Sequence, residues 1–146
     1  MAVVREMAVY FKNRKLAGKG PESVKVSDSR DVARVFHFLK DKCHEEAWAA
    51  LLSADNSIQA IYQVGKGGMT SCNVPASEVF KAALLANTPA FLLVHNHPSG
   101  NVMPSATDRE LTRELTAGAK LLGLAFLDHV IIGNGRHYSF ATTGNL

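Results

Sequence analysis

Two histidines and an aspartate between residues 91 and 108 offer the side chains of a metal site. Residues 90–94 form an apolar run without polar alternation, which is typical of a buried strand. His95 and His97 stand at its polar end, and both imidazoles leave the same face because the residues are two apart on an extended backbone. Asp108 falls in the first turn of the next periodic segment, where a helix N-terminus favours its charge. Such a set suits a zinc ion that keeps its fourth coordination position open for water.

The residues between the histidines and the aspartate predict two chain reversals. Residues 98–100, Pro-Ser-Gly, predict a turn directly after the strand. Pro104 and Ser105 predict a second turn, and Ser105 stands three residues before Asp108, which is the spacing of a capping arrangement. A His-x-His pair alone is weak evidence, because histidines are frequent on the exposed face of a strand. The whole string is far more specific, since glycine and proline occur where the backbone must reverse.

The order His-x-His, seven residues, Ser105, two residues and Asp108 resembles the JAMM (MPN-type) metalloprotease motif. It has the form carried by RadC-like proteins, in which HNHPSG, PS and D recur in this order, and the resemblance covers most of residues 24–146. It implies an α/β (α+β) fold of the MPN/JAMM type, a cytidine-deaminase-like three-layer sandwich with a central mixed sheet flanked by helices. It also implies one Zn²⁺ ion held by His95, His97 and Asp108.

Hydrolysis at such a site needs a group that takes a proton from water and delivers it to the leaving amine. In the resembled family a glutamate directly precedes the first core strand, and the E-x-[aromatic] pattern falls on Glu46, Ala47 and Trp48. Glu46 is therefore the expected general base, with its neighbour Glu45 as the rival. From spacing alone, both glutamates are solvated residues of a helix-to-strand loop. The resemblance also gives Ser105, besides its capping role, a hydroxyl that stabilises the oxyanion of the tetrahedral intermediate.

Composition indicates a single globular domain. The chain has 146 residues, of which 47% are hydrophobic and 20% charged. It contains no apolar run of membrane-spanning length, and its first residues lack the apolar stretch of a secretory signal. Cys43 and Cys72 form no close pair, so reduced thiols in the cytoplasm are expected. Neither Cys43 nor the adjacent His44 is expected to bind the metal ion, and Cys72 is expected to be a small core or loop residue.

The net charge of +3 is concentrated near the N-terminus. Residues 1–25 carry six basic and two acidic side chains, a net charge of +4, which leaves −1 for residues 26–146. The first segment is interpreted as a basic N-terminal arm, and the second as the MPN/JAMM-type RadC-like domain. Contact with nucleic acid or with an acidic partner is one interpretation of the arm. A solvated entry segment is favoured instead, because the basic run is short and carries no interleaved aromatic residues.

Periodicity predicts the elements that position the motif. A helix that begins at Ser77 ends in a left-handed cap at Asn87, and a long helix after the motif ends at Gly123. Gly118 and Ala119 on the apolar stripe of that long helix predict close packing against a sheet. The order of elements predicts a sandwich with the metal site at the end of a strand. The other expected elements are a helix over 29–42 and strands over 7–11, 24–26, 48–52, 58–64, 124–132 and 137–141.

The function expected from these features is zinc-dependent cleavage of peptide or isopeptide bonds in a peptide or protein substrate, although a His-His-Asp set tolerates other divalent ions. One alternative is a DNA-repair-associated or other nucleic-acid-associated accessory protein with a structural or idle metal site. Another is a fold stabilised by zinc without catalysis, which chelation would unfold. Apolar strands at either end of the sheet offer an edge for a homodimer. Asp128 and His129 match the RadC pattern, and a structural hydrogen bond is expected of them.

Overall fold

The strand that carries His95 and ends directly before His97 lies in the middle of the sheet, and for this reason all seven of its residues are buried. The computed structural model describes residues 24–68 and 73–146. The sheet has five strands in the order β2-β1-β3-β4-β5, in which β3 and β4 are parallel and the other neighbours are antiparallel. The elements are α1 (Ser29–Val35), a 3₁₀ helix η1 (His37–Leu39), β1 (Glu46–Leu52), β2 (Ile58–Lys66), α2 (Ala76–Leu85), β3 (Ala90–Asn96), α3 (Ala106–Leu122), β4 (Ala125–Ile132) and β5 (His137–Ser139).

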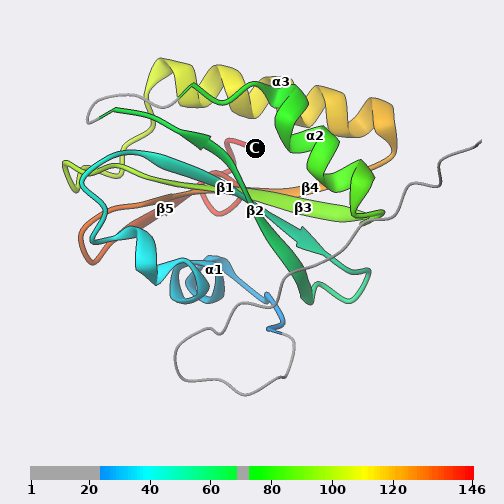
Figure 1. Ribbon diagram of the computed structural model, residues 1–146, viewed down its shortest axis with the longest axis horizontal. Coiled ribbons are helices and arrows are strands. Elements are labelled where there is room, and N and C mark those ends of the chain that lie inside the picture. The colour runs from blue at the N-terminus through cyan, green and yellow to red at the C-terminus, as the bar shows by residue number, and fades with distance from the viewer. Residues whose placement is uncertain (1–23, 69–72) are drawn as a thin grey trace, which may run out of the picture.

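Helices cover both faces of the sheet, so the fold has three layers (Figure 1). On one face, Val32 of α1 packs in a core cluster with Leu92 of β3. On the other face, Val79 of α2 and Leu115 of α3 pack in a second cluster with Leu93. Because Leu92 and Leu93 are neighbours in one strand, the two clusters lie on opposite sides of the sheet. The expected α+β sandwich with a central mixed sheet is confirmed.

The predicted elements that fall on described residues are present, and the differences lie at their ends. The helix expected over 29–42 ends at Val35 and continues as a 3₁₀ turn. The shorter helix still leaves Phe36 fully buried, so the apolar periodicity is satisfied without a longer helix. β1 begins at Glu46, two residues before the expected strand. The backbone N–H of Glu46 donates a hydrogen bond to the side chain of Asn96 at 2.7 Å, which holds this first residue beside β3.

Two helix ends form as predicted, and the expected packing against the sheet holds for Ala119, which lies in one cluster with Leu93, but not for Gly118. Asn87 after α2 has a φ of 51° and Gly123 after α3 has a φ of 69°, so both adopt the left-handed conformation. Gly118 was expected to allow α3 to approach the sheet. Instead it faces α2, because a Cβ atom at Gly118 would lie 2.4 Å from Cζ of Phe80. The glycine therefore permits close contact between two helices of the same layer.

Some expectations fall on parts of the chain that the structure does not describe. The strand expected over 7–11, nearly all of the basic arm and Cys72 lie outside the described residues. The short extended segment near residue 25 is present as a bridge between Lys25 and Ser57. A homodimer formed at β2 or β5, the two edges of the described sheet, stays a prediction. Within the described ranges, no helix combines the length and the apolar character needed to cross a membrane.

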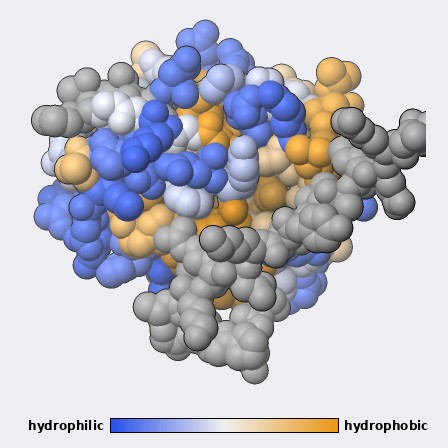
Figure 2. Space-filling view, viewed as in Figure 1, coloured by the Kyte–Doolittle hydropathy of each residue, from blue (hydrophilic) through white to orange (hydrophobic). Residues whose placement is uncertain are grey.

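Exposed hydrophobic side chains gather over the C-terminal ends of α2 and α3, at the right of Figure 2. α3 is 17 residues long, so its two ends are about 25 Å apart at 1.5 Å per residue. The exposed apolar surface is therefore remote from Asp108, which lies in the first turn of α3. Its members are Leu84, Leu85, Leu121 and Leu122, with exposed fractions between 43% and 87%.

The loop that follows β3 is held against the turn between β4 and β5. The backbone N–H of His97 donates to the carbonyl of Ile132 at 2.9 Å. Gly100 has a φ of +82°, and its N–H closes the turn by donating to the carbonyl of His97 at 2.9 Å. A Cβ atom at Gly133 would lie only 2.6 Å from the carbonyl oxygen of Gly100 and 2.5 Å from the side chain of Val102. Glycine is required at Gly133 by this close approach.

We expect Gly133→Ala to lower the free energy of unfolding by about 1–3 kcal/mol, the usual cost of overpacking. The methyl group meets backbone atoms of Gly100, which cannot move without displacing the turn after His97. Urea denaturation measures the change. Gly68→Ala is the matched control, since a Cβ atom there meets nothing within 4 Å, and its effect should stay within about 0.5 kcal/mol. Equal stability of the two variants would contradict this account of the loop.

Candidate metal centre

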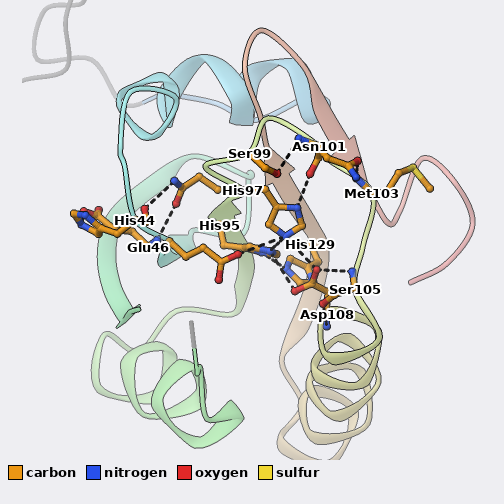
Figure 3. A network of polar contacts seen from close by, with 12 residues as sticks. His44, Glu46, His95, His97, Ser99, Asn101, Met103, Ser105, Asp108 and His129 are labelled. Carbon is orange, nitrogen blue, oxygen red and sulfur yellow. Dashed lines mark hydrogen bonds and ion pairs between the residues drawn. The ribbon is translucent and has the colours of Figure 1, made fainter. Parts of the chain in front are cut away.

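The side chains of His95, His97 and Asp108 converge between the end of β3 and the start of α3 (Figure 3). The Nε2 atoms of the two histidines lie 3.0 Å apart. Oδ1 of Asp108 is 3.2 Å from His95 Nε2, and Oδ2 is 3.3 Å from His97 Nε2. Among the described residues, this is the one group of His, Cys, Asp and Glu side chains whose atoms lie close enough to share an ion. The structure thus brings together the three residues that the motif designates.

The spacing and chemistry of these atoms fit a divalent transition metal. A tetrahedral ion with ligands at about 2.0–2.1 Å has ligand atoms about 3.3–3.4 Å apart. The observed separations are 3.0, 3.2 and 3.3 Å, so small movements suffice to admit such an ion. Two imidazoles with one carboxylate favour zinc, copper, iron or nickel over magnesium and calcium, which prefer oxygen ligands. Three protein ligands leave a fourth position for water or substrate.

The outer nitrogen of His97 is held by the main chain of the following loop. Its Nδ1 lies 2.7 Å from the carbonyl oxygen of Asn101. A carbonyl oxygen only accepts, so Nδ1 must carry the proton. In the neutral ring the lone pair is then on Nε2, which is the atom directed at the metal-binding group. The loop therefore fixes both the orientation of His97 and the nitrogen that it offers.

The outer nitrogen of His95 meets a third histidine. Its Nδ1 lies 2.9 Å from Nε2 of His129 in β4, and Nδ1 of His129 lies 2.7 Å from the hydroxyl of Thr112 in α3. His129 is fully buried, and this burial lowers its pKa well below the ordinary value, so the ring is neutral. The structural hydrogen bond expected of the Asp128-His129 pair is confirmed. Sequence reasoning missed that His129 contacts a metal-site residue, because only the fold brings β4 next to β3.

Asp108 is ionised in this arrangement. Burial raises its pKa, but the His95 and His97 rings that face its two oxygens outweigh this effect and hold the pKa of the carboxyl group well below its usual range. The reciprocal effect acts on His97, whose pKa is raised in spite of partial burial because its protonated ring can donate to Asp108. The group therefore contains a fixed negative charge that attracts a cation.

Ser105 is the N-cap of α3, as the sequence predicts. Its hydroxyl oxygen accepts a hydrogen bond from the backbone N–H of Asp108 at 3.1 Å. The Asp108 carboxylate in turn accepts from the backbone N–H of Ser105 at 2.8 Å, which completes a capping box. This box orients Asp108 toward the histidines. The expected oxyanion role of Ser105 stays a prediction.

Glu46 does not face the metal-binding group, which corrects its assignment as the general base. Ala47 pairs with His95 across β1 and β3, so these two side chains share one face of the sheet. Glu46 and Trp48 stand on either side of Ala47 and point to the opposite face. There the Glu46 carboxylate accepts hydrogen bonds from Trp48 Nε1 and His44 Nε2, each at 3.0 Å. Figure 3 shows Glu46 beside His44, apart from the group of His95, His97 and Asp108. The pattern that suggested Glu46 places it beside the tryptophan and away from the histidines.

Glu45 is the glutamate on the face of the histidines. Its backbone N–H and carbonyl bond to residues 67–68, so the strand geometry extends one residue before β1. Alternation then places its side chain with that of Ala47. Oε1 of Glu45 lies 3.9 Å from Nε2 of His97, and the side chain is only 13% exposed. It lines a cavity together with Asp108. Of the two glutamates that the sequence left as candidates, the geometry therefore favours Glu45.

Asn96, the residue between the two histidines, holds the backbone on both sides of Glu45. Its Oδ1 accepts from the backbone N–H of Glu46 at 2.7 Å, and its Nδ2 donates to the carbonyl of His44 at 3.1 Å. Asn96 is 1% exposed and its side chain points away from the histidine face. Sequence reasoning assigned no role to this residue. The available signal was an amide side chain inside a buried strand, which must find hydrogen-bond partners.

The remaining candidate residues lie outside the metal-binding group. Asp128 accepts from the Ser139 hydroxyl at 2.6 Å and from the backbone N–H of Ala141 at 2.9 Å, which ties the end of the chain to β4. Cys43 is exposed, and its thiol lies 3.7 Å from Nδ1 of His44. The other ring nitrogen of His44 bonds to Glu46, so neither Cys43 nor His44 belongs to the group of metal ligands.

Comparison with known proteins agrees with the fold. A family model described as the RadC-like JAB domain matches residues 26–145, and the chain belongs to this family. The match spans all of the elements described above from α1 to β5.

Relatives named UPF0758 proteins are similar to most of the chain. A protein of Chloroflexus aurantiacus is 46% identical over 94 residues, which cover 64% of this chain and 41% of the relative. A protein of Staphylococcus haemolyticus is 35% identical over 144 residues, which cover 98% of this chain and 63% of the relative. A protein of Trichlorobacter lovleyi is 39% identical over 118 residues, covering 78% and 51%. The chain thus spans about half the length of the curated relatives that it matches.

We expect Glu46→Gln to cost about 1.5–3 kcal/mol of stability at pH 7, the usual contribution of hydrogen bonds to a buried charge. Burial raises the pKa of Glu46, but hydrogen bonds from Trp48 and His44 and the ion pair with Lys42 outweigh it, so the folded pKa lies below the unfolded value of 4.5. The stabilisation is therefore present above pH 4.5 and is lost as the pH falls through the folded pKa.

Urea unfolding of the Glu46→Gln variant at pH 7 and near pH 3 measures this effect. The loss relative to the unmodified protein should shrink at the lower pH, because the unmodified carboxyl group is then increasingly protonated. Glu114→Gln, at an exposed position of α3, is the control and should change stability by less than about 0.5 kcal/mol. A loss of the same size at both pH values would contradict the charged role of Glu46.

Proposed function

We propose that the chain is a metal-dependent hydrolase of peptide or isopeptide bonds. In this proposal His95, His97 and Asp108 hold one Zn²⁺ ion, and Glu45 is the general base and acid. The observation that carries the proposal is the position of the Glu45 carboxylate, 3.9 Å from Nε2 of His97, on the same face as the three convergent side chains. Membership of the RadC-like JAB domain family supports it, because JAB domains include metalloproteases.

The protein groups divide the chemistry of peptide hydrolysis among themselves. A zinc ion held by the three residues supplies a Lewis acid that polarises a carbonyl group and acidifies water. Glu45 takes the proton that water loses and then delivers it to the leaving amine. Asn96 keeps Glu45 in reach by bonding the peptide groups on either side of it. This precise placement matters because catalysis by proton transfer requires hydrogen-bond contact.

Ser105 retains a donor for the oxyanion. A serine hydroxyl has one proton and two lone pairs, and the bond from the Asp108 N–H uses only a lone pair. The hydroxyl proton is therefore available to a substrate oxygen while the helix stays capped. This division of donor and acceptor supports the two roles that the sequence assigns to Ser105.

The lining of the cavity favours a peptide over a nucleic acid as the substrate. Glu45 and Asp108 contribute carboxylates to the cavity, and Leu93 and Leu111 contribute apolar side chains. Its described lining contains no lysine or arginine. Phosphate backbones are bound through lysine and arginine side chains, whereas a peptide presents neutral carbonyl groups and apolar side chains.

Separate substitution of Glu45 and Glu46 by glutamine tests which of the two is the general base. With zinc-loaded protein and a peptide library that includes isopeptide-linked pairs, we expect Glu45→Gln to lower kcat/KM by about 10²–10⁴-fold while zinc binding is retained. Glu46→Gln should keep turnover close to that of the unmodified protein, although it is less stable. Loss of turnover in Glu46→Gln with full activity in Glu45→Gln would contradict the proposal, as would zinc binding without any turnover by the unmodified protein.

Metal removal separates catalysis from a purely structural zinc site. Both hydrophobic clusters of the core are built without any of the three ligand residues, and the three ligand side chains already converge without an ion. A chelator should therefore abolish turnover while the circular dichroism spectrum stays that of the folded protein. Unfolding on chelation would indicate a structural zinc site instead.

A further inference from the structure

The two histidines of the metal-binding group differ in what holds their outer nitrogen. Nδ1 of His97 faces the carbonyl of Asn101, which can only accept a hydrogen bond. Nδ1 of His95 faces Nε2 of His129, and an imidazole nitrogen either donates or accepts, depending on the tautomer. The nitrogen that His95 offers to a metal ion is therefore determined by the position of the proton on His129.

The partners of His129 determine that position. The hydroxyl of Thr112 donates its single proton to the backbone carbonyl of Asp108 at 2.7 Å, because a carbonyl cannot donate. The same hydroxyl oxygen must then accept from Nδ1 of His129, 2.7 Å away, so His129 carries its proton on Nδ1. In the neutral ring Nε2 is left as an acceptor for the Nδ1–H of His95. His95 then presents the lone pair of Nε2 to the metal-binding group.

The surroundings of His129 keep the ring in place for this purpose. It is fully buried in β4, beside Leu93 of β3 in the strand register. Its ring stacks on Phe140, with centroids 4.8 Å apart and planes inclined by 6°. The stacking fixes the plane of the ring, and a flip within that plane would break both hydrogen bonds. The position of each ring nitrogen is therefore fixed by packing and bonding together.

We propose that Thr112 and His129 are positioning residues that fix the tautomer of His95 by a hydrogen-bond relay starting at the backbone of Asp108. The relay connects Asp108 and His95, two of the proposed ligands, through the protein interior. It runs from the first turn of α3 through His129 of β4 to β3. This inference rests on the zinc site of the proposed function but not on hydrolysis. Partners of this kind typically change metal affinity by 10–100-fold.

Zinc affinity of matched threonine variants tests the relay. Competition with a chromophoric chelator should show Thr112→Val binding Zn²⁺ about 10–100-fold more weakly, because valine keeps the shape but cannot accept from His129. Thr112→Ser restores the hydroxyl and should bind like the unmodified protein. Thr116→Val is the control, since its hydroxyl makes the same kind of bond one turn later, to the Thr112 carbonyl at 2.8 Å. Unchanged affinity in a folded Thr112→Val variant would overturn the proposal.

The tautomers can be read in the unmodified protein, so the test does not depend on a variant that folds. Long-range ¹H–¹⁵N spectra of histidine-labelled protein should show His129 protonated on Nδ1, both without metal and with zinc. In the zinc-loaded protein, His95 should also be protonated on Nδ1. A proton on Nε2 of His129 would overturn the relay. Failure of the unmodified protein to bind zinc would overturn the proposed function, and the metal-free spectrum would still decide the relay.

Discussion

Side chains alternate between the two faces of a β-sheet. At β1 and β3 this alternation decides which residues face the metal-binding group and which face the opposite side. His95 and His97 lie on one face, and Asn96 between them lies on the other. One strand away, Glu45 shares the histidine face while Glu46 is turned toward His44 and Trp48. A shift of one residue at the start of β1 would exchange the two glutamates. The hydrogen bonds from Asn96 to the peptide groups around Glu45 hold the strand in the register that the chemistry requires.

Two local structures, the capping box of α3 and the turn after His97, both stabilise the fold and set the geometry of the site. The capping box at the start of α3 satisfies helix N–H groups and at the same time aims the Asp108 carboxylate at the histidines. The turn after His97 is fixed by Gly100 and by the close approach of Gly133, and the carbonyl that orients the His97 ring belongs to the same loop. Because these constraints come from the protein alone, the three ligands converge before any ion binds. Preorganisation of this kind reduces the cost of assembling the site.

The sequence predicted the site where the information is local and failed where it is not. His95, His97 and Asp108 could be found because strand periodicity, two turns and a helix start lie within one short segment. The choice between Glu45 and Glu46 depended on where β1 begins, and periodicity places the end of a strand only to within a few residues. The role of His129 depends on a parallel pairing with β3 that no local pattern reports. The need for glycine at Gly133 likewise comes from contact with a loop more than 30 residues earlier, which no local pattern reports.

Membership of the RadC-like JAB domain family and the geometry of the site support the proposal that a single cation is held with Glu45 facing its open position. A crystal structure of the zinc-loaded protein, with anomalous scattering recorded at the zinc absorption edge, tests this arrangement. We expect one peak bound by the Nε2 atoms of His95 and His97 and by the carboxylate of Asp108, with the Glu45 carboxylate directed at the remaining position. A peak elsewhere, or a zinc ion faced by Glu46 in place of Glu45, would contradict it.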